Sequence, residues 1–317
     1  MAHYNTFREQ LAIAHPAFGH ALWEPDPGQY PPVQVGDVGF IRDGKFHRLF
    51  NALLPADDPS HRSRGTPAYH EPLRLRLRDH IDPGILSPNN FYSYGVNVVS
   101  GGLEVLASGV GSANVEFSCT RKQGAVLSLP VTARREDTIS LGHFRKWIIK
   151  HIDSWLAFAH ELGVGIEMED IVLVTGCHRT KSWTNTVLNE VQTNVQLALG
   201  VQVGASGASV TWQGSNLQIQ GATVCHGPNG VDLPENQCIF IRGFRVKRYF
   251  GIIPRIKAAA EPKPDTRGDE GESSRDPLHV LLKYIAKHVP CDMALVHDDD
   301  WEQILRAGDR TVSGDRV

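Results

Sequence analysis

The stretch NVQLALGVQVGASGASVTWQG, residues Asn194–Gly214, decides how the chain is interpreted. Small or apolar residues alternate along it with neutral polar ones, at the period of two that is typical of a β-strand. The surrounding window from Val191 to Val231 holds 41 residues without a single Asp, Glu, Lys or Arg, although 21% of the chain is charged. Since strands that face water usually carry charges as protection against edge pairing, this neutrality requires an explanation.

One explanation is a strand that must be compatible with both protein and lipid. A charged side chain on a lipid-facing strand costs about 2–4 kcal/mol at the bilayer midplane. A tilted strand of about 9–11 residues crosses the hydrocarbon layer, and the run from Asn194 to Ala205 has about that length. Neutral polar residues on the other face could line an aqueous lumen. The alternative is a sandwich strand whose polar residues are neutral for an unrelated reason.

The composition excludes some classes of protein. Lys and Arg number 32 and Asp and Glu 35, giving a net charge of −3, which argues against a nucleic-acid partner bound through bulk charge. The five cysteines form no C-x-x-C pair, and the first ten residues contain no apolar core of a secretory signal. We therefore expect a reduced, cytoplasmic protein.

The periodicities predict an α+β fold, a twisted and mainly antiparallel β-sheet decorated with helices. A helix is expected over residues 5–23, with Thr6 and Glu9 at capping-box spacing. A hairpin is expected around Asp43-Gly44, and short strands from Phe91 onward. An apolar stripe predicts a helix over 139–162, followed by a buried strand over 170–177, and residues 237–254 are expected to form a strand pair.

The domain organisation follows from a change in composition. Residues 257–277 are rich in charge, Pro and Gly, so we expect a disordered linker. It divides a body, residues 1–256, from a small helix–strand–helix tail, residues 278–317, in which Asp298 to Asp300 cap the last helix. Residues 257–317 hold 9 basic and 13 acidic side chains. A unit as small as the tail should dock on the body.

No arrangement of residues predicts an enzyme. The segment Val172–Ser182 lacks the G-x-x-x-x-G-K-[ST] spacing of a phosphate-binding loop, because Thr180 precedes Lys181. The chain has no G-x-S-x-G and no H-x-x-x-H pair, and Cys177-His178 supplies too few ligands for zinc. We therefore expect no catalytic activity, no cofactor and no metal.

In the order and texture of its elements, the chain resembles the pore-forming domain of the gasdermin family, in particular its small microbial or fungal members. Residues 89–117 are similar to that family's first membrane-inserting hairpin region. AHELGVGIEMEDIVLVTGCHRTKSWTNTVLNE, residues 159–190, is similar to the helix–loop–strand unit that enters its second hairpin. Residues 194–214 and 233–246 are similar to the second hairpin and the closing strand.

The resemblance implies a function as well as a fold. A gasdermin-like protein binds acidic lipids, oligomerises into a ring and inserts two β-hairpins per subunit, which permeabilises membranes in regulated cell death. It moves from the cytoplasm to the membrane when a protease or a partner protein removes or displaces a C-terminal inhibitory segment. The residues expected to face lipid are Val96, Val98, Leu103, Val105, Val115, Phe117, Val195, Leu197, Leu199, Val201, Val203, Val210 and Trp212.

Basic residues are the expected contacts to acidic lipid, at about 1 kcal/mol for each one near the surface. The first helix carries Arg8 as its one fixed positive charge, fewer than the family's first helix usually has. The full set of candidates is Arg8, Arg42, Lys45, Arg121, Lys122, Arg145, Lys146 and Lys150.

Two other functions remain open at this stage. The chain could be a soluble, β-rich module that binds a sugar or a peptide without any membrane activity. It could also be a hydrolase or a nucleotide-using enzyme with an unrecognised site that involves Lys181.

Overall fold

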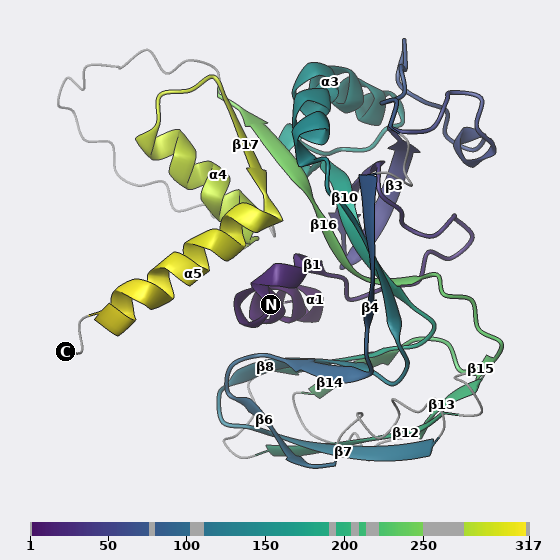
Figure 1. Cartoon of the computed structure of the whole chain (residues 1–317), viewed down its shortest axis with the longest axis vertical. Coiled ribbons are helices and arrows are strands. Elements are labelled where there is room, and N and C mark those ends of the chain that lie inside the picture. The colour runs from purple at the N-terminus through teal and green to yellow at the C-terminus, as the bar shows by residue number, and fades with distance from the viewer. Residues whose placement is uncertain are drawn as a thin grey trace.

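The computed structural model is an α+β fold of three antiparallel sheets and four helices among the described residues, which are 2–75, 80–101, 111–189, 195–203, 209–213, 222–249 and 276–314 (Figure 1). For 195–199, 209–213 and 308–314 it describes the backbone alone. The predicted fold class, a mainly antiparallel sheet structure decorated with helices and followed by a small α/β tail, is confirmed.

The largest sheet, here the main sheet, has its centre at two long neighbouring strands, β10 and β16. Its eight strands are β1 (His20–Ala21), β2 (Asp37–Arg42), β3 (Lys45–Asn51), β4 (Ile81–Leu86), β9 (Ala133–Thr138), β10 (Val172–Thr180), β16 (Gln237–Arg248) and β17 (Met293–His297). Short 3₁₀ turns lie at η1 (Pro16–Phe18), η2 (Pro59–His61) and η4 (Met168–Asp170).

Two smaller sheets lie beyond the first helix, α1 (His3–Ala14; Figure 1). The middle sheet contains β5 (Asn89–Tyr92), β8 (Gln123–Leu129), β11 (Thr184–Asn189) and β14 (Ala222–His226). The outer sheet contains β6 (Val96–Ser100), β7 (Gly111–Cys119), β12 (Val195–Val203), β13 (Ser209–Gln213) and β15 (Gly230–Val231).

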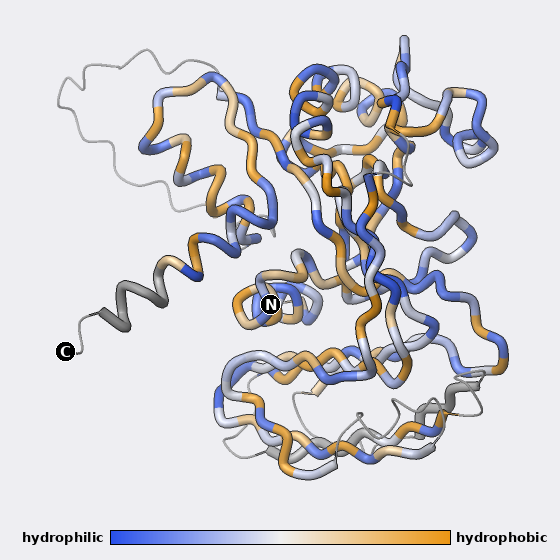
Figure 2. Tube along the Cα trace, viewed as in Figure 1, coloured by the Kyte–Doolittle hydropathy of each residue, from blue (hydrophilic) through white to orange (hydrophobic). Residues whose placement is uncertain are grey.

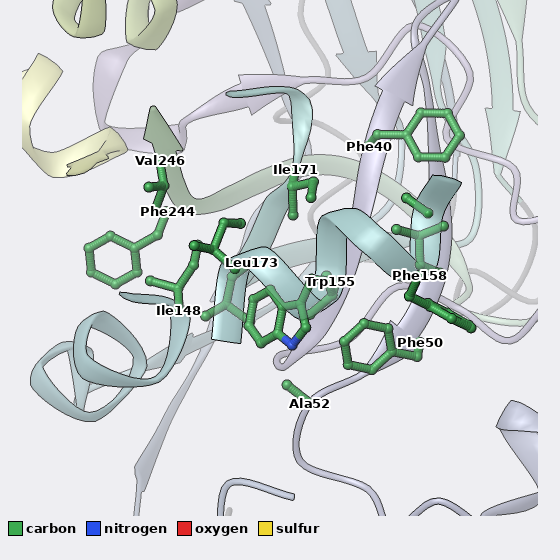
Figure 3. Close-up of a cluster of buried hydrophobic side chains, with 14 of the residues drawn as sticks. Phe40, Phe50, Ala52, Ile148, Trp155, Phe158, Ile171, Leu173, Phe244 and Val246 are labelled. Carbon is green, nitrogen blue, oxygen red and sulfur yellow. The ribbon is translucent and has the colours of Figure 1, made fainter. Parts of the chain in front are cut away.

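The apolar stripe predicted for residues 139–162 forms α3 (Leu141–Glu161), which packs on the main sheet. Trp155 and Ile148 are buried against Phe50 of β3 and Phe244 of β16 (Figure 3). Each fully buried side chain of this size contributes about 1.5–3 kcal/mol relative to exposure. The helix ends as expected at Gly163, whose φ of 73° would strain a residue with a side chain.

The first predicted helix is only half right. The helix α1 runs from His3 to Ala14, and a 3₁₀ turn and the short strand β1 replace the rest of the predicted span. Pro16 cannot continue the helix because it lacks an N–H and its ring clashes with the preceding turn. The Thr6–Glu9 capping box is also wrong, since the helix begins three residues before Thr6.

The hairpin predicted at Gly44 is confirmed, whereas the turn predicted near Gly243 is wrong. At the confirmed hairpin, Asp43 and Gly44 have φ of 53° and 77°, as a two-residue turn between twisted strands requires. Residues 237–248, however, form one continuous strand, so the predicted strand pair is wrong. Gly243 does not turn the chain there: a Cβ at this position would lie 2.6 Å from the Leu173 carbonyl oxygen, and glycine allows the close approach.

The tail forms the predicted helix–strand–helix, α4 (Pro277–His288), β17 and α5 (Asp298–Gly314). It docks by adding β17 to the edge of β16, antiparallel, with Phe244 opposite His297. Residues 257–275 of the predicted linker lie outside the described part of the chain. Asp276 and Pro277, the last two residues of that predicted linker, are the N-cap and first residue of α4.

Candidate functional site

The two regions predicted to form inserting hairpins lie side by side in the outer sheet. Strands β6 and β7 come from the first region and β12 and β13 from the second, and β7 pairs with β12 along its full length, from Gly111 opposite Val203 to Cys119 opposite Val195. The sheet order is therefore β6-β7-β12-β13, with β15 at the far edge. Nearly 80 residues separate β7 from its partner in sequence.

The register places the predicted lipid-facing residues on one face of this sheet. Opposite residues in an antiparallel pair share a face, and the cross-strand rows are Val96–Cys119–Val195, Val98–Phe117–Leu197, Val115–Leu199, Ala113–Val201–Trp212 and Val203–Val210. Among those whose side chains are described, Val96, Val115, Phe117, Val201 and Val203 are buried and Val98 is exposed. Leu103 and Val105 lie outside the described residues.

The opposite face of the outer sheet is polar and almost free of charge. Asn114 is exposed and Glu116 and Ser118 are half-buried, alternating with buried Val115 and Phe117, and the same alternation colours β7 in Figure 2. Glu116 is the one charged residue in the five described strands of this sheet. A face of this kind is compatible with water.

The outer sheet is the continuation of the middle sheet, folded back upon it. Strand β5 runs into β6, β7 into β8, β11 into β12 and β13 into β14, so the two sheets have the same strand order. Between the pairs Leu188–Gly124 and Val195–Cys119 the chain advances seven residues on one strand and five on the other. Both advances are odd, so the alternation shifts by one residue at each bend: odd-numbered residues such as Phe117 face the space between the sheets in β7, and even-numbered ones such as Val126 face it in β8.

Two of the connections between these sheets, from β5 to β6 and from β7 to β8, lie within the described residues. Gly95 turns β5 into β6 with φ of 86°, and a Cβ there would lie 2.5 Å from the Arg121 side chain of the second bend. The Thr120 side chain donates to the Gly95 carbonyl at 3.0 Å, and the Ser93 hydroxyl accepts from the Ala125 N–H at 2.9 Å. The bends are therefore held by a few local contacts around one glycine.

The faces that meet inside this fold-back are packed together. Phe117 and Val115 of the outer sheet contact Val126 and Leu188 of the middle sheet in one buried cluster. On its other side the middle sheet packs against α1, through Phe7 and residues that include Leu127. The layers are thus α1, the middle sheet and the outer sheet (Figure 1).

The predicted lipid-binding residues fall into three places rather than one. Arg8 and Arg42 line a cavity of about 260 Å³ between α1 and the β2–β3 hairpin, and Lys45 follows at the hairpin turn. Arg42 donates to the Gly165 carbonyl at 3.2 Å. Arg8 is largely buried, with 12% of its side chain exposed, so it is not available on the present surface.

The remaining candidates are exposed at opposite ends of the molecule. Arg121 and Lys122 lie at the bend between β7 and β8. Arg145, Lys146 and Lys150 lie on α3, at the far end of the longest axis (Figure 1), and Lys150 pairs with Glu71 at 3.3 Å. The structure therefore brings only part of the predicted basic set together.

Asp276, which sequence reasoning missed, joins the tail to the body. Its buried carboxylate lies 2.9 Å from Arg245 of β16, 3.5 Å from His20 of β1 and 3.7 Å from Arg8 of α1. Burial would raise the pKa of this carboxyl, but Arg245, His20 and Arg8 together hold it well below its usual range. An Asp-Pro pair at the start of an apolar helix is an N-cap signal that could have marked the residue.

A second contact joins the tail to α1. Trp301 of α5 donates its ring N–H to the carbonyl of Ala12 at 3.2 Å. Together with the Asp276–Arg8 pair, this places the tail against the middle and the C-terminal turn of α1, the helix that covers the middle sheet. We name Asp276 with its partners Arg8, His20 and Arg245 the tail latch.

The start of α5 supplies a prediction about pH. Burial raises the pKa of Asp298 to about 7, against a hydrogen bond that the carboxylate accepts from the Gly243 N–H at 2.8 Å and against Arg245 and Arg242, while Asp276 adds to the rise. A carboxyl whose folded pKa is raised stabilises the fold fully below its unfolded pKa, near 3.8, and this contribution is lost as pH rises to about 7. Asp298→Asn should therefore gain stability over the parent between pH 4 and 7.5, by at least about 3 °C in Tm at the upper end.

The Tm of the variant must be compared with that of the parent at each pH, because a neighbouring residue also titrates abnormally. Burial lowers the pKa of His297 to about 3, with Arg242 and Arg145 adding to the effect. The buried neutral histidine loses stability as pH falls, so the two groups oppose each other in the same range. Thermal unfolding at pH 4.5, 6 and 7.5 measures the difference. A Tm difference that is constant across pH would show that the Asp298 carboxyl titrates normally.

Within the described ranges, no helix is long and apolar enough to cross a membrane. The same residues contain no group of three or more His, Cys, Asp or Glu side chains able to hold a metal ion. The five cysteines are all free.

Comparison with known proteins gives no match: the chain fits no protein-family model, no curated protein and no solved structure. The gasdermin resemblance therefore stays a prediction, and the functional argument rests on the geometry of the outer sheet and the tail latch.

Proposed function

We propose that this protein permeabilises membranes by swinging the outer sheet away from the middle sheet, so that two adjacent hairpins straighten and insert into lipid. The observation that carries the proposal is the shared strand order of the two sheets. Each bent pair, such as β11–β12 from Thr184 to Val203, becomes one strand of 20 residues, about 65 Å long. That exceeds the 9–11 residues needed to cross the hydrocarbon layer.

The composition of the two faces supports the same proposal. After opening, the apolar face that includes Val115, Phe117 and Val201 would meet lipid tails, and the neutral face with Asn114 and Ser118 would meet water. Burial in lipid replaces burial against the middle sheet, so the apolar side chains lose little on moving. Glu116 lies on the face that stays wet.

The tail fits the role of a restraint on this change. It holds α1 through the tail latch and through Trp301, and α1 covers the far side of the middle sheet. Its release would uncover Arg8 and Arg245, two cations that acidic lipid headgroups would attract. The active form is proposed to be a membrane-bound homo-oligomer, and cutting or displacement of the tail is the proposed trigger.

Dye release from lipid vesicles tests the proposal. A protease site placed within residues 257–275 allows the purified full chain to be cut in the same tube. We expect the cut protein to release dye at least tenfold faster than the uncut protein from vesicles containing anionic phospholipid, and only weakly from neutral ones. A chain with a scrambled site controls for the protease.

Two outcomes would count against it. If the cut protein releases no dye although its tail has dissociated, the chain is better described as a β-rich binding module. If cut and uncut proteins release dye equally, permeabilisation stands but the tail is not its restraint.

A further inference from the structure

The face of the middle sheet that lies beneath the outer sheet carries a row of polar side chains. The register aligns Asn90, Ser128 and Thr184 across three neighbouring strands, and Thr186 lies in the next row, opposite Val126. Val126 and Leu188 of the same strands pack into the cluster between the two sheets, so the alternation places these polar residues on that side as well. They are at most 7% exposed.

The oxygens of these polar side chains, on Asn90, Ser128, Thr184 and Thr186, are buried without a hydrogen-bond partner in the described part of the chain. On the opposite face of the same sheet Asn185 is partly paired: its NH₂ group donates to the carbonyls of Leu22 and Trp23 at 3.1 and 2.8 Å, while its side-chain oxygen has no partner among the described residues. Burying a hydroxyl without a hydrogen bond is unfavourable, whereas exposing it to water is not.

We propose that this polar row, Asn90, Ser128, Thr184 and Thr186, is exposed to water in the active form, and that its burial in the closed fold favours opening. The inference rests on the proposed function. If the middle sheet carried apolar side chains at these positions, both facing surfaces would be apolar and the closed fold would be a stable sandwich. Because the polar row lies there instead, opening exposes the middle sheet to water in the same step that transfers the outer sheet to lipid.

The arrangement also places the row outside the membrane after opening. In a straightened strand Ser128 lies nine residues beyond Cys119, about 30 Å along the chain. The apolar segment Gly111–Cys119 is itself long enough to cross the hydrocarbon layer. The row therefore belongs to the part of the opened sheet that stands in water.

A pair of isosteric substitutions tests the inference. Thr184→Val with Thr186→Val removes two buried hydroxyls and keeps the volume of the side chains. We expect the Tm of the uncut protein to rise by about 2 to 5 °C, and dye release by the cut protein from anionic vesicles to slow at least fivefold.

Two matched variants separate this effect from general stabilisation. Thr180 is equally buried, but its hydroxyl donates to the Thr132 carbonyl at 3.2 Å, so Thr180→Val should lower the Tm. Gly142→Ala should raise the Tm through helix propensity, because the site on α3 has open space for a Cβ, and it should leave dye release unchanged.

The inference is overturned if the double variant has an unchanged or lower Tm, because the hydroxyls are then satisfied by water or by residues outside the described part. It is also overturned if the Tm rises but dye release does not slow while the parent is active. If the parent itself releases no dye, the proposed function fails, and the bias toward opening fails with it even where the Tm rises.

Discussion

Asp276→Asn should make the uncut protein permeabilise anionic vesicles without any protease. The substitution removes the carboxylate that contacts Arg245, His20 and Arg8 together, and leaves Arg8 with Glu9 at 3.9 Å. Removing one partner of a buried ion pair costs about 3–5 kcal/mol, because the remaining charges stay buried without compensation. A loss of this size in tail docking corresponds to about a 150- to 5,000-fold larger population of the released tail.

The effect on the tail latch should be specific, since asparagine is as good an N-cap as aspartate and the start of α4 should persist. Asp153→Asn is the matched control: Asp153 pairs with Arg248 at 2.8 Å, but 61% of its side chain is exposed, and exposed pairs contribute about 0–1 kcal/mol. Dye release and hydrogen exchange in α4 and β17 are the measurements. An Asp276→Asn protein that stays silent, with α4 and β17 protected as in the parent, would remove the tail latch from the account.

The elements of the fold could largely be predicted from the sequence, because they depend on local patterns. The apolar stripe from Phe144 to Trp155 predicts a helix and Asp43-Gly44 predicts a turn, and neither prediction needs to know which segments pack against these residues. The alternation in β7 likewise decided that Val115 and Phe117 share a face. The prediction failed where a glycine served close packing, as at Gly243, instead of ending a strand.

The arrangement of the site could not be predicted, because it depends on contacts between distant segments. Alternation states which residues share a face but not which layer covers it, so the fold-back of the outer sheet left no local signal. Asp276 lies at the end of a segment whose composition indicates disorder, and its partner Arg8 lies near the other end of the chain. Charge patterns identify Arg8 as a cation and leave its burial against a carboxylate unknown.

The central claim is that β7 and β8 straighten into one strand, and a disulfide across their bend tests it. A Cβ added at Gly124 would lie 3.1 Å from the sulfur of Cys119 and 2.6 Å from a methyl of Val96. Gly124→Cys in a Val96→Ala background therefore places two cysteines within bonding range in the closed fold. A disulfide holds the two Cα atoms within about 7 Å, whereas a straight strand separates residues 119 and 124 by about 16 Å.

The measurement is dye release from anionic vesicles by the cut protein, oxidised and then reduced, with the disulfide verified by mass spectrometry. A Cys119→Ala version of the same protein controls for the other cysteines. The account predicts at least tenfold slower release in the oxidised state, recovery on reduction, and no response to oxidant in the control. Equal release by the verified disulfide form and the reduced form would contradict it, since the bend would then stay closed in the active state.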